Sequence, residues 1–145
     1  MIELLLLTLV LVCPRGDDAT QAVQIWNNYV EQTHVILYGD CESPDTIPIT
    51  STSKPPHLYC PGASGCTDLK SAWCGFSSYG ERHRVLSCLH ELGHILGLHH
   101  PEPMRCDPNT IMGYGFCGDS SLYPTWQDVA QVRRNYEVTL DRYYD

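Results

Sequence analysis

The most constraining feature of the sequence is a short run that reads HELGHILGLHH, from His90 to His100. If the run is helical, His90 and His94 lie one turn apart with their imidazoles on a common face, and both can bind one metal ion. A continuous helix would carry His100 to its far side, so the chain has to turn sharply before that residue. Gly97 permits the turn, because glycine adopts the left-handed conformation that ends helices at little steric cost. The run therefore predicts a metal site of three histidines, with Glu91 beside the ion but not bound to it.

A second segment, Thr110 to Tyr114, reads TIMGY and places a methionine shortly after the histidines. Together the two segments match the pattern H-E-x-x-H-x-x-G-x-x-H with a downstream methionine turn, which resembles the metzincin clan of zinc endopeptidases. The resemblance implies one catalytic zinc ion bound by the three histidines. It also implies that Met112 forms an apolar floor under the histidines without binding the metal.

The same resemblance implies an α+β fold of the zincin type in a single compact catalytic domain. We expect a mixed, twisted sheet of about four or five strands, three helices and an irregular carboxy-terminal half. Within the clan, the small size and a cysteine pair around the methionine turn resemble snapalysin-type enzymes. A histidine as third ligand, at position 100, is instead similar to matrixins and astacins, so both likenesses stay open.

The chemistry expected of such a site follows from its ligands. Three neutral imidazoles leave zinc doubly positive with an open position for water, whose pKa then falls toward neutrality. We expect Glu91 to remove a proton from that water and later to donate it to the departing amide nitrogen. Tyr114 occupies the position where astacin-like and serralysin-like enzymes keep a tyrosine that approaches the zinc, and its phenol would help to stabilise the oxyanion. The alternative for Tyr114 is a plain wall of the specificity pocket.

Length and charge limit what can surround this site. The chain has 145 residues, of which 43% are hydrophobic, and this suffices for one domain with a real core. The formal net charge of −8 argues against a nucleic-acid or anionic-membrane partner, because either would favour a basic surface. The expected partner is a protein or peptide substrate, cleaved by a monomer without stable membrane insertion.

The amino terminus carries an apolar run from Leu4 to Val12. The run resembles the centre of a secretion signal cleaved after Cys13, and it is too short to span a bilayer. We favour a signal peptide over residues 1–16, followed by a metzincin-like catalytic domain over residues 17–145. The alternative is that residues 7–12 form the first buried strand of the sheet, as a continuous apolar run bounded by proline and glycine allows.

Eight cysteines indicate disulfide bonds made in an oxidising compartment, so we expect a secreted protein. Removing Cys13 with a signal peptide would leave an odd number of cysteines, which favours retention of the amino terminus. We expect Cys106 to pair with Cys117, because the two bracket the methionine turn. The alternative, a second zinc ion held by cysteines, lacks a C-x-x-C pair anywhere in the chain.

Hydrophobic periodicity predicts the elements in the first part of the chain. Residues 19–32 follow helical spacing and predict a long helix, with Trp26 in the core and with Asp17 and Asp18 as caps. Residues 34–38 are rich in strand formers and end at a turn signal, so they predict a strand.

A proline-, serine- and threonine-rich loop follows from Cys41 to Pro61, with short strands expected at residues 46–49 and 57–60. Acidic side chains around the start of this loop suggest a structural calcium site, although no recognisable calcium loop is present. The three candidate ligands are Asp40, Glu42 and Asp45.

The second half of the chain contains the active helix. Residues 70–76 predict the last strand before that helix, along the rim where a peptide substrate would add as an extended strand. Residues 81–96 predict the active helix itself, with Arg84 exposed to solvent. A last helix is expected from Thr125, with Thr125 and Asp128 as a capping box, and residues 143–145 are expected to form a tail.

Two other classes of function fit parts of this pattern. A catalytically silent, secreted zinc-binding domain that recognises proteins would keep the histidines but could dispense with Glu91. A structural zinc module would need four protein ligands, whereas only three converge here. Hydrolysis of a peptide library with and without a chelator separates these possibilities from a zinc endopeptidase.

Overall fold

The computed structural model describes residues 8–52, 65–68, 71–76, 80–113 and 123–144, with side chains as far as residue 137. Within these residues, five strands form one mixed sheet in the order β2-β1-β3-β5-β4. β1 pairs in parallel with β2 and β3, and β3 pairs in parallel with β5, whereas β4 runs antiparallel to β5 at the sheet edge. The strand bounds are Thr8–Arg15 (β1), Val35–Gly39 (β2), Ile47–Ser51 (β3), Cys66–Thr67 (β4) and Ala72–Cys74 (β5).

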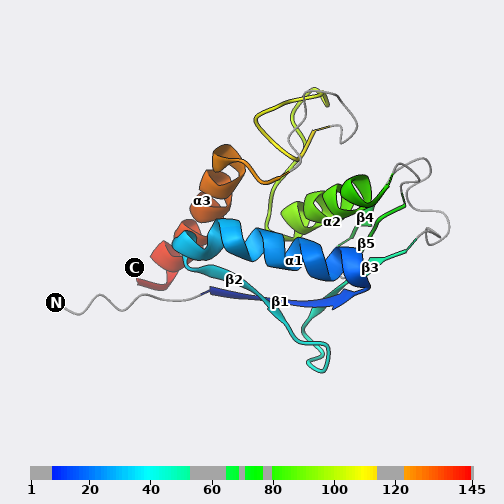
Figure 1. Cartoon of the computed structure of the whole chain (residues 1–145). Helices are drawn as coiled ribbons and strands as arrows, with labels where there is room; N and C mark the ends of the chain where they lie inside the picture. The colour runs from blue at the N-terminus through cyan, green and yellow to red at the C-terminus, as the bar shows by residue number, and fades with distance from the viewer. Residues whose placement is uncertain (1–7, 53–64, 69–70, 77–79, 114–122, 145) are drawn as a thin grey trace.

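Three α-helices and one short 3-10 helix complete the described fold. They are α1 (Asp17–Val30), η1 (Glu31–Thr33), α2 (Glu81–Ile95) and α3 (Trp126–Tyr144). α1 connects the parallel strands β1 and β2, which need a crossover of this kind. α1 packs on β1, β2 and β3, and α2 packs on β3, β4 and β5, so that the two helices lie side by side over the sheet (Figure 1). These elements confirm the predicted α+β fold with a mixed sheet and three helices.

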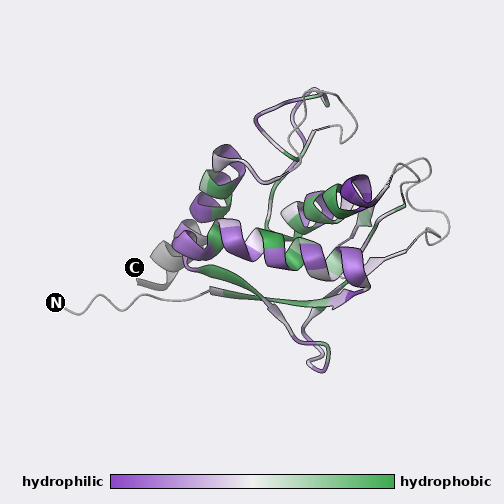
Figure 2. Ribbon diagram, viewed as in Figure 1, coloured by the Kyte–Doolittle hydropathy of each residue, from purple (hydrophilic) through white to green (hydrophobic). Residues whose placement is uncertain are grey.

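The core lies between the sheet and the two helices that cover it. Trp26 of α1 is fully buried, as predicted, and its Nε1–H donates to the carbonyl oxygen of Leu89 in α2 at 2.8 Å. Val12 and Ile49 contribute buried side chains from β1 and β3. In Figure 2, β1 and β2 are largely apolar, while apolar and hydrophilic residues alternate along α1 and α2. A single apolar layer therefore positions α2 on the sheet.

The amino-terminal run forms a strand in the interior of the sheet. β1 is hydrogen-bonded to a neighbour on each side, and Cys13 forms a disulfide bond with Cys41. Of the two interpretations of this run, the strand accounts for residues 8–15, but the strand is not fully buried as predicted, because only Val12 and Cys13 are buried and Leu9 is 52% exposed. Removal of a signal peptide stays a prediction.

The start of α1 corrects two predictions. The helix begins at Asp17 with Gly16 as its N-cap, and no side chain caps it. Asp17 and Asp18 instead lie in the first turn, where negative charge is favourable next to the helix dipole. Asp18 also pairs with Arg84 of α2, with Nε and Oδ2 3.2 Å apart, so Arg84 is not simply exposed to solvent as predicted.

The prediction that residues 70–76 run along the rim of the sheet is wrong. The strand predicted at residues 70–76 is present as β5, but it lies inside the sheet, and β4 forms the edge. β4 contains two residues, too few to show the alternation that reveals strands in a sequence. The strand predicted at residues 46–49 is present as β3, while residues 57–60 lie outside the described part of the chain.

The carboxy-terminal helix begins as predicted. Thr125 N–H donates to Asp128 Oδ2 at 3.0 Å, and Asp128 N–H donates to Thr125 Oγ1 at 3.2 Å, which confirms the capping box. The prediction that residues 143–145 form a tail is wrong for Tyr143 and Tyr144, because α3 continues to Tyr144. None of the described helices has both the length and the hydropathy required of a membrane span.

Candidate functional site

The predicted active helix is α2, and it carries His90, Glu91 and His94. Its apolar side is fully buried at Leu89 and Leu92, which holds the helix on the core. Because the histidines lie beside this apolar stripe, they are half-buried at its edge.

α2 ends in a Schellman turn. Gly97 has a φ of 86°, in the left-handed region. Leu98 N–H donates to the carbonyl of Gly93 at 2.8 Å, and Gly97 N–H donates to that of His94 at 3.0 Å. Leu98 is buried beyond the turn, and the chain then brings His100 back toward the helix. A side chain other than glycine at position 97 would be strained in this conformation.

The structure brings His90, His94 and His100 together through their Nε2 atoms. His100 Nε2 lies 3.1 Å from the Nε2 atoms of both His90 and His94. The ring centroids are 4.7 to 5.1 Å apart. Among the described residues, this is the one group of three or more metal-ligating side chains close enough to share an ion.

Backbone carbonyls select the tautomer of the two helical histidines. Nδ1 of His90 lies 2.9 Å from the carbonyl oxygen of Ile111, and Nδ1 of His94 lies 2.9 Å from that of Leu98. A carbonyl oxygen only accepts, so each Nδ1 carries the proton and each Nε2 presents a lone pair. The lone pairs of His90 and His94 both face Nε2 of His100, an arrangement that favours a cation among the three nitrogens.

Burial keeps these imidazoles in the neutral form that binds metals. Desolvation lowers the pKa of His90 to about 4, against the opposing effect of its hydrogen bond to Ile111. Desolvation likewise lowers the pKa values of His94 and His100. The three rings therefore offer unprotonated nitrogens at neutral pH.

The donor set fits a zinc ion. Zinc binds histidine nitrogen at about 2.0–2.1 Å in tetrahedral geometry, which places neighbouring ligand atoms about 3.3 Å apart. The observed nitrogen separations of 3.1 Å are close to this spacing. Three protein ligands leave one tetrahedral position, which is typical of catalytic rather than structural zinc sites.

Glu91 follows His90 in α2 and is buried, with 5% of its surface exposed. Desolvation raises the pKa of its carboxyl group to about 7, while a hydrogen bond from Thr67 of β4 acts in the opposite direction. A carboxyl group with a pKa near neutrality can both accept and return a proton.

Met112 lies beneath α2. It is 1% exposed, and a Cβ at Gly93 would come within 2.5 Å of its Sδ. Only a residue without a side chain at position 93 allows this close approach. The predicted apolar methionine floor therefore has a matching contact on the active helix.

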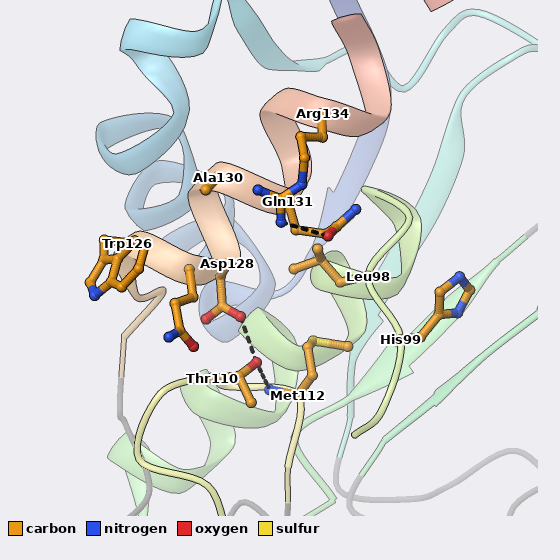
Figure 3. Close-up of a pocket in the computed structure, with 10 residues that line it drawn as sticks. Leu98, His99, Thr110, Met112, Trp126, Asp128, Ala130, Gln131 and Arg134 are labelled. Atoms are coloured by element: carbon orange, nitrogen blue, oxygen red, sulfur yellow. Dashed lines mark hydrogen bonds between the residues drawn. The ribbon is translucent and has the colours of Figure 1, made fainter. Parts of the chain in front are cut away.

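A buried carboxylate anchors the two residues just before Met112. Asp128 of α3 accepts hydrogen bonds from Thr110 Oγ1 at 2.5 Å and from Ile111 N–H at 3.1 Å. Thr110 Oγ1 in turn accepts from Met112 N–H at 3.0 Å (Figure 3). Because the Ile111 carbonyl contacts His90, this network links the start of α3 to a candidate metal ligand.

A cavity of about 450 Å³ lies between α3 and the methionine turn. Leu98, Met112 and Ala130 line it, together with the polar side chains of Gln131 and Arg134 (Figure 3). None of the three convergent histidines lines it, so it is not the candidate metal site.

The other predicted site residues either lie outside the described residues or make different contacts. Tyr114 and Cys117 lie outside the described residues, although Cys106 is disulfide-bonded. The proposed calcium ligands Asp40, Glu42 and Asp45 are described, but they do not form a group close enough to share an ion. The Asp40 carboxylate instead accepts from the backbone N–H of Glu42 at 3.0 Å, so it stabilises a turn.

Sequence reasoning missed two residues that support the site. Thr67 lies 24 residues before Glu91, and no motif connects the two. Asp128 was predicted as a helix cap, and its second role toward Ile111 follows only from the fold. A local signal existed for the first role of Asp128, the threonine three residues before it, but none existed for Thr67.

Comparison with solved structures finds a distant structural likeness. No family model and no curated protein matches the chain. The crystal structure of archaemetzincin from Methanopyrus kandleri is similar with a TM-score of 0.49 and 16% sequence identity, over 94% of this chain and 99% of that one. A likeness of this degree leaves the function to be argued from the site itself.

Proposed function

We propose that this chain is a secreted, zinc-dependent endopeptidase that hydrolyses peptide bonds in proteins. One observation carries the proposal: three histidine Nε2 atoms converge, two of them with a tautomer set by backbone carbonyls, and a buried glutamate follows the first of these histidines in α2. This combination offers a cation two lone pairs that already face the third nitrogen, and it supplies a group that can transfer protons. Resident disulfide bonds support the extracellular location.

His90, His94 and His100 would hold the zinc ion. When bound with three neutral ligands and one open position, zinc acts as a Lewis acid toward a substrate carbonyl and makes water more acidic. The hydrogen bonds at Nδ1 of His90 and His94 orient their rings, a supporting role that commonly strengthens metal binding.

Glu91 would transfer the proton in the reaction. Its carboxylate takes a proton from the attacking water and returns it to the nitrogen of the departing amine. A pKa of about 7 matches this double task, since the group has to be a base in one step and an acid in the next. Tyr114 would contribute a phenol hydrogen bond to the oxyanion, and Met112 would support the histidines from below.

The decisive test combines metal analysis with hydrolysis of a peptide library. We expect one zinc ion per chain, cleavage of internal peptide bonds identified by mass spectrometry, and loss of cleavage with a chelator. Glu91→Ala should keep the zinc ion and lower kcat/KM at least 100-fold, because general-base catalysis contributes about 10²–10⁴-fold. A variant that still cleaves at the parent rate would refute the role of Glu91, and a protein that binds zinc without hydrolysing any peptide would refute the activity.

A further inference from the structure

The edge strand β4 lies directly against Glu91. Thr67 Oγ1 donates a hydrogen bond to Glu91 Oε2 and lies 3.5 Å from the carbonyl oxygen of the same residue. A Cβ at Gly65 would come within 2.6 Å of Glu91 Oε1 and within 2.8 Å of its Cγ. The carboxylate is thus held by a donor at Thr67 and confined by the backbone at Gly65.

Three links fix β4 relative to α2. Thr67 pairs with Ala72 in the antiparallel ladder to β5, and Cys74 of β5 forms a disulfide bond with Cys88 of α2. Gly75, just after β5, donates its N–H to Ser87 Oγ at 3.1 Å. Because Cys88 and Glu91 are separated by less than one helical turn of 3.6 residues, these links also set the distance from β4 to the carboxylate.

From this arrangement we infer that Thr67 is a positioning residue for the reaction, acting through the Glu91 carboxylate. With Oε2 held by the hydroxyl, Oε1 is the oxygen left to take and return a proton. Position matters here because a displacement of about 1 Å can lower a rate about 100-fold. The inference rests on the proposed function, since it assigns a supporting residue to the proton transfer by Glu91.

A purely structural role predicts a different result. If Thr67 only satisfied a buried acceptor, its removal would lower stability and leave the turnover number of the folded protein unchanged. Kinetics and unfolding have to be measured on the same variants for this reason.

The kinetic experiment compares Thr67→Val with Thr67→Ser and a matched control. Valine keeps the shape of threonine without the hydroxyl, so kcat should fall about 10- to 100-fold at unchanged KM and zinc content. Serine keeps the hydroxyl and should restore most of kcat. The control is Thr33→Val, which removes a half-buried hydroxyl bonded to the Val30 carbonyl at 2.6 Å, and it should leave kcat unchanged.

The second experiment measures thermal unfolding of the zinc-free protein in a double-mutant cycle with Glu91→Ala. Thr67→Val should lower Tm by about 3–5 °C in the parent, the shift expected for loss of one hydrogen bond in a chain of this size. In the Glu91→Ala background the hydroxyl has already lost its partner, so the same change should lower Tm far less.

The outcomes separate this inference from the proposed function. A kcat of Thr67→Val within twofold of the parent would overturn the positioning role, as would strictly additive Tm changes in the cycle. If Thr67→Val does not fold, Gly65→Ala replaces it, because the added Cβ should displace Glu91 and lower kcat with the hydroxyl in place. Parent protein without zinc and without hydrolysis would overturn the proposed function, whereas the pairing of Thr67 with Glu91 is decided by the Tm cycle.

Discussion

The two parts of the molecule that meet at the histidines are stabilised by different forces. α2, with His90 and His94, is held by apolar burial around Trp26 and by the Cys74–Cys88 disulfide bond. The segment 98–113, with His100, contains no helix or strand. Its side chains Leu98, Ile111 and Met112 reach the same core, but the course of its backbone is held by hydrogen bonds to Asp128 of α3. Packing is non-directional and fixes where an element lies, whereas hydrogen bonds fix how single groups point. We therefore expect changes in the packed part to lower stability most, and changes in the hydrogen-bonded part to lower zinc affinity as well.

The largest expected effect on stability comes from Trp26. Trp26→Ala removes a fully buried side chain and should lower the free energy of unfolding of the zinc-free protein by about 3–5 kcal/mol. Zinc affinity of the remaining folded protein should change much less. Denaturant unfolding and zinc titration measure the two quantities. The matched control is Trp126→Ala, since Trp126 is 77% exposed and its loss should cost less than about 0.5 kcal/mol.

Asp128→Ala should remove the hydrogen bonds that hold the segment 98–113 on α3. The change removes the acceptor of Ile111 N–H and Thr110 Oγ1, so the free energy of unfolding should fall by about 2–4 kcal/mol. Zinc should bind about 10- to 100-fold more weakly, because the Ile111 carbonyl that orients His90 loses its anchor. Asp128→Asn keeps one acceptor oxygen and should recover part of both losses. Unchanged zinc affinity in Asp128→Ala would mean that α3 does not support the ligands.

Asn135→Ala tests the turn that leads to His100. Asn135 Nδ2 donates to the carbonyl oxygens of Leu96 and Gly97, each at 3.2 Å. Its loss should lower the free energy of unfolding by about 1 kcal/mol, because these contacts are partly open to solvent. Zinc affinity should fall by up to about tenfold, less than in Asp128→Ala. Calorimetric titration with zinc would show whether the turn affects binding at all.

The smallest effect is expected at an exposed ion pair on α3. Arg133 Nε and Glu137 Oε1 are 2.7 Å apart, and both side chains are more than half exposed. Glu137→Gln should lower the free energy of unfolding by less than about 0.5 kcal/mol and leave zinc affinity unchanged. A large loss of affinity in this variant would show that any disturbance of α3 affects the site, which would remove the distinction between the two parts.

The elements that could be predicted from the sequence are those with a local signal. Helical spacing revealed α1 and α2, and the capping box at Thr125 and Asp128 revealed the start of α3. The spacing of the histidines, with Gly97 between the second and the third, was sufficient to predict that the three side chains converge. Each of these signals lies within a short stretch of the sequence.

The other features of the fold and of the site could not be predicted, because they depend on contacts between distant segments. β4 has two residues and no pattern of its own, and its hydrogen bond to Glu91 arises only when the sheet has formed. Asp18 was predicted as a cap because aspartate often caps helices, but the fold places Arg84 beside it. The orientation of His90 by Ile111, and of Ile111 by Asp128, likewise joins segments 17 to 21 residues apart.

Ile111 contacts both Asp128, through its N–H, and His90, through its carbonyl oxygen, and these two contacts affect the order in which the site is completed. The ribosome makes the active helix first and Asp128 only later, so a nascent chain already carries the histidines while Ile111 still lacks its acceptor. The anchor of the carbonyl that orients His90 is therefore complete only after translation has passed Asp128. A partly made chain holds the histidines but not yet their final geometry.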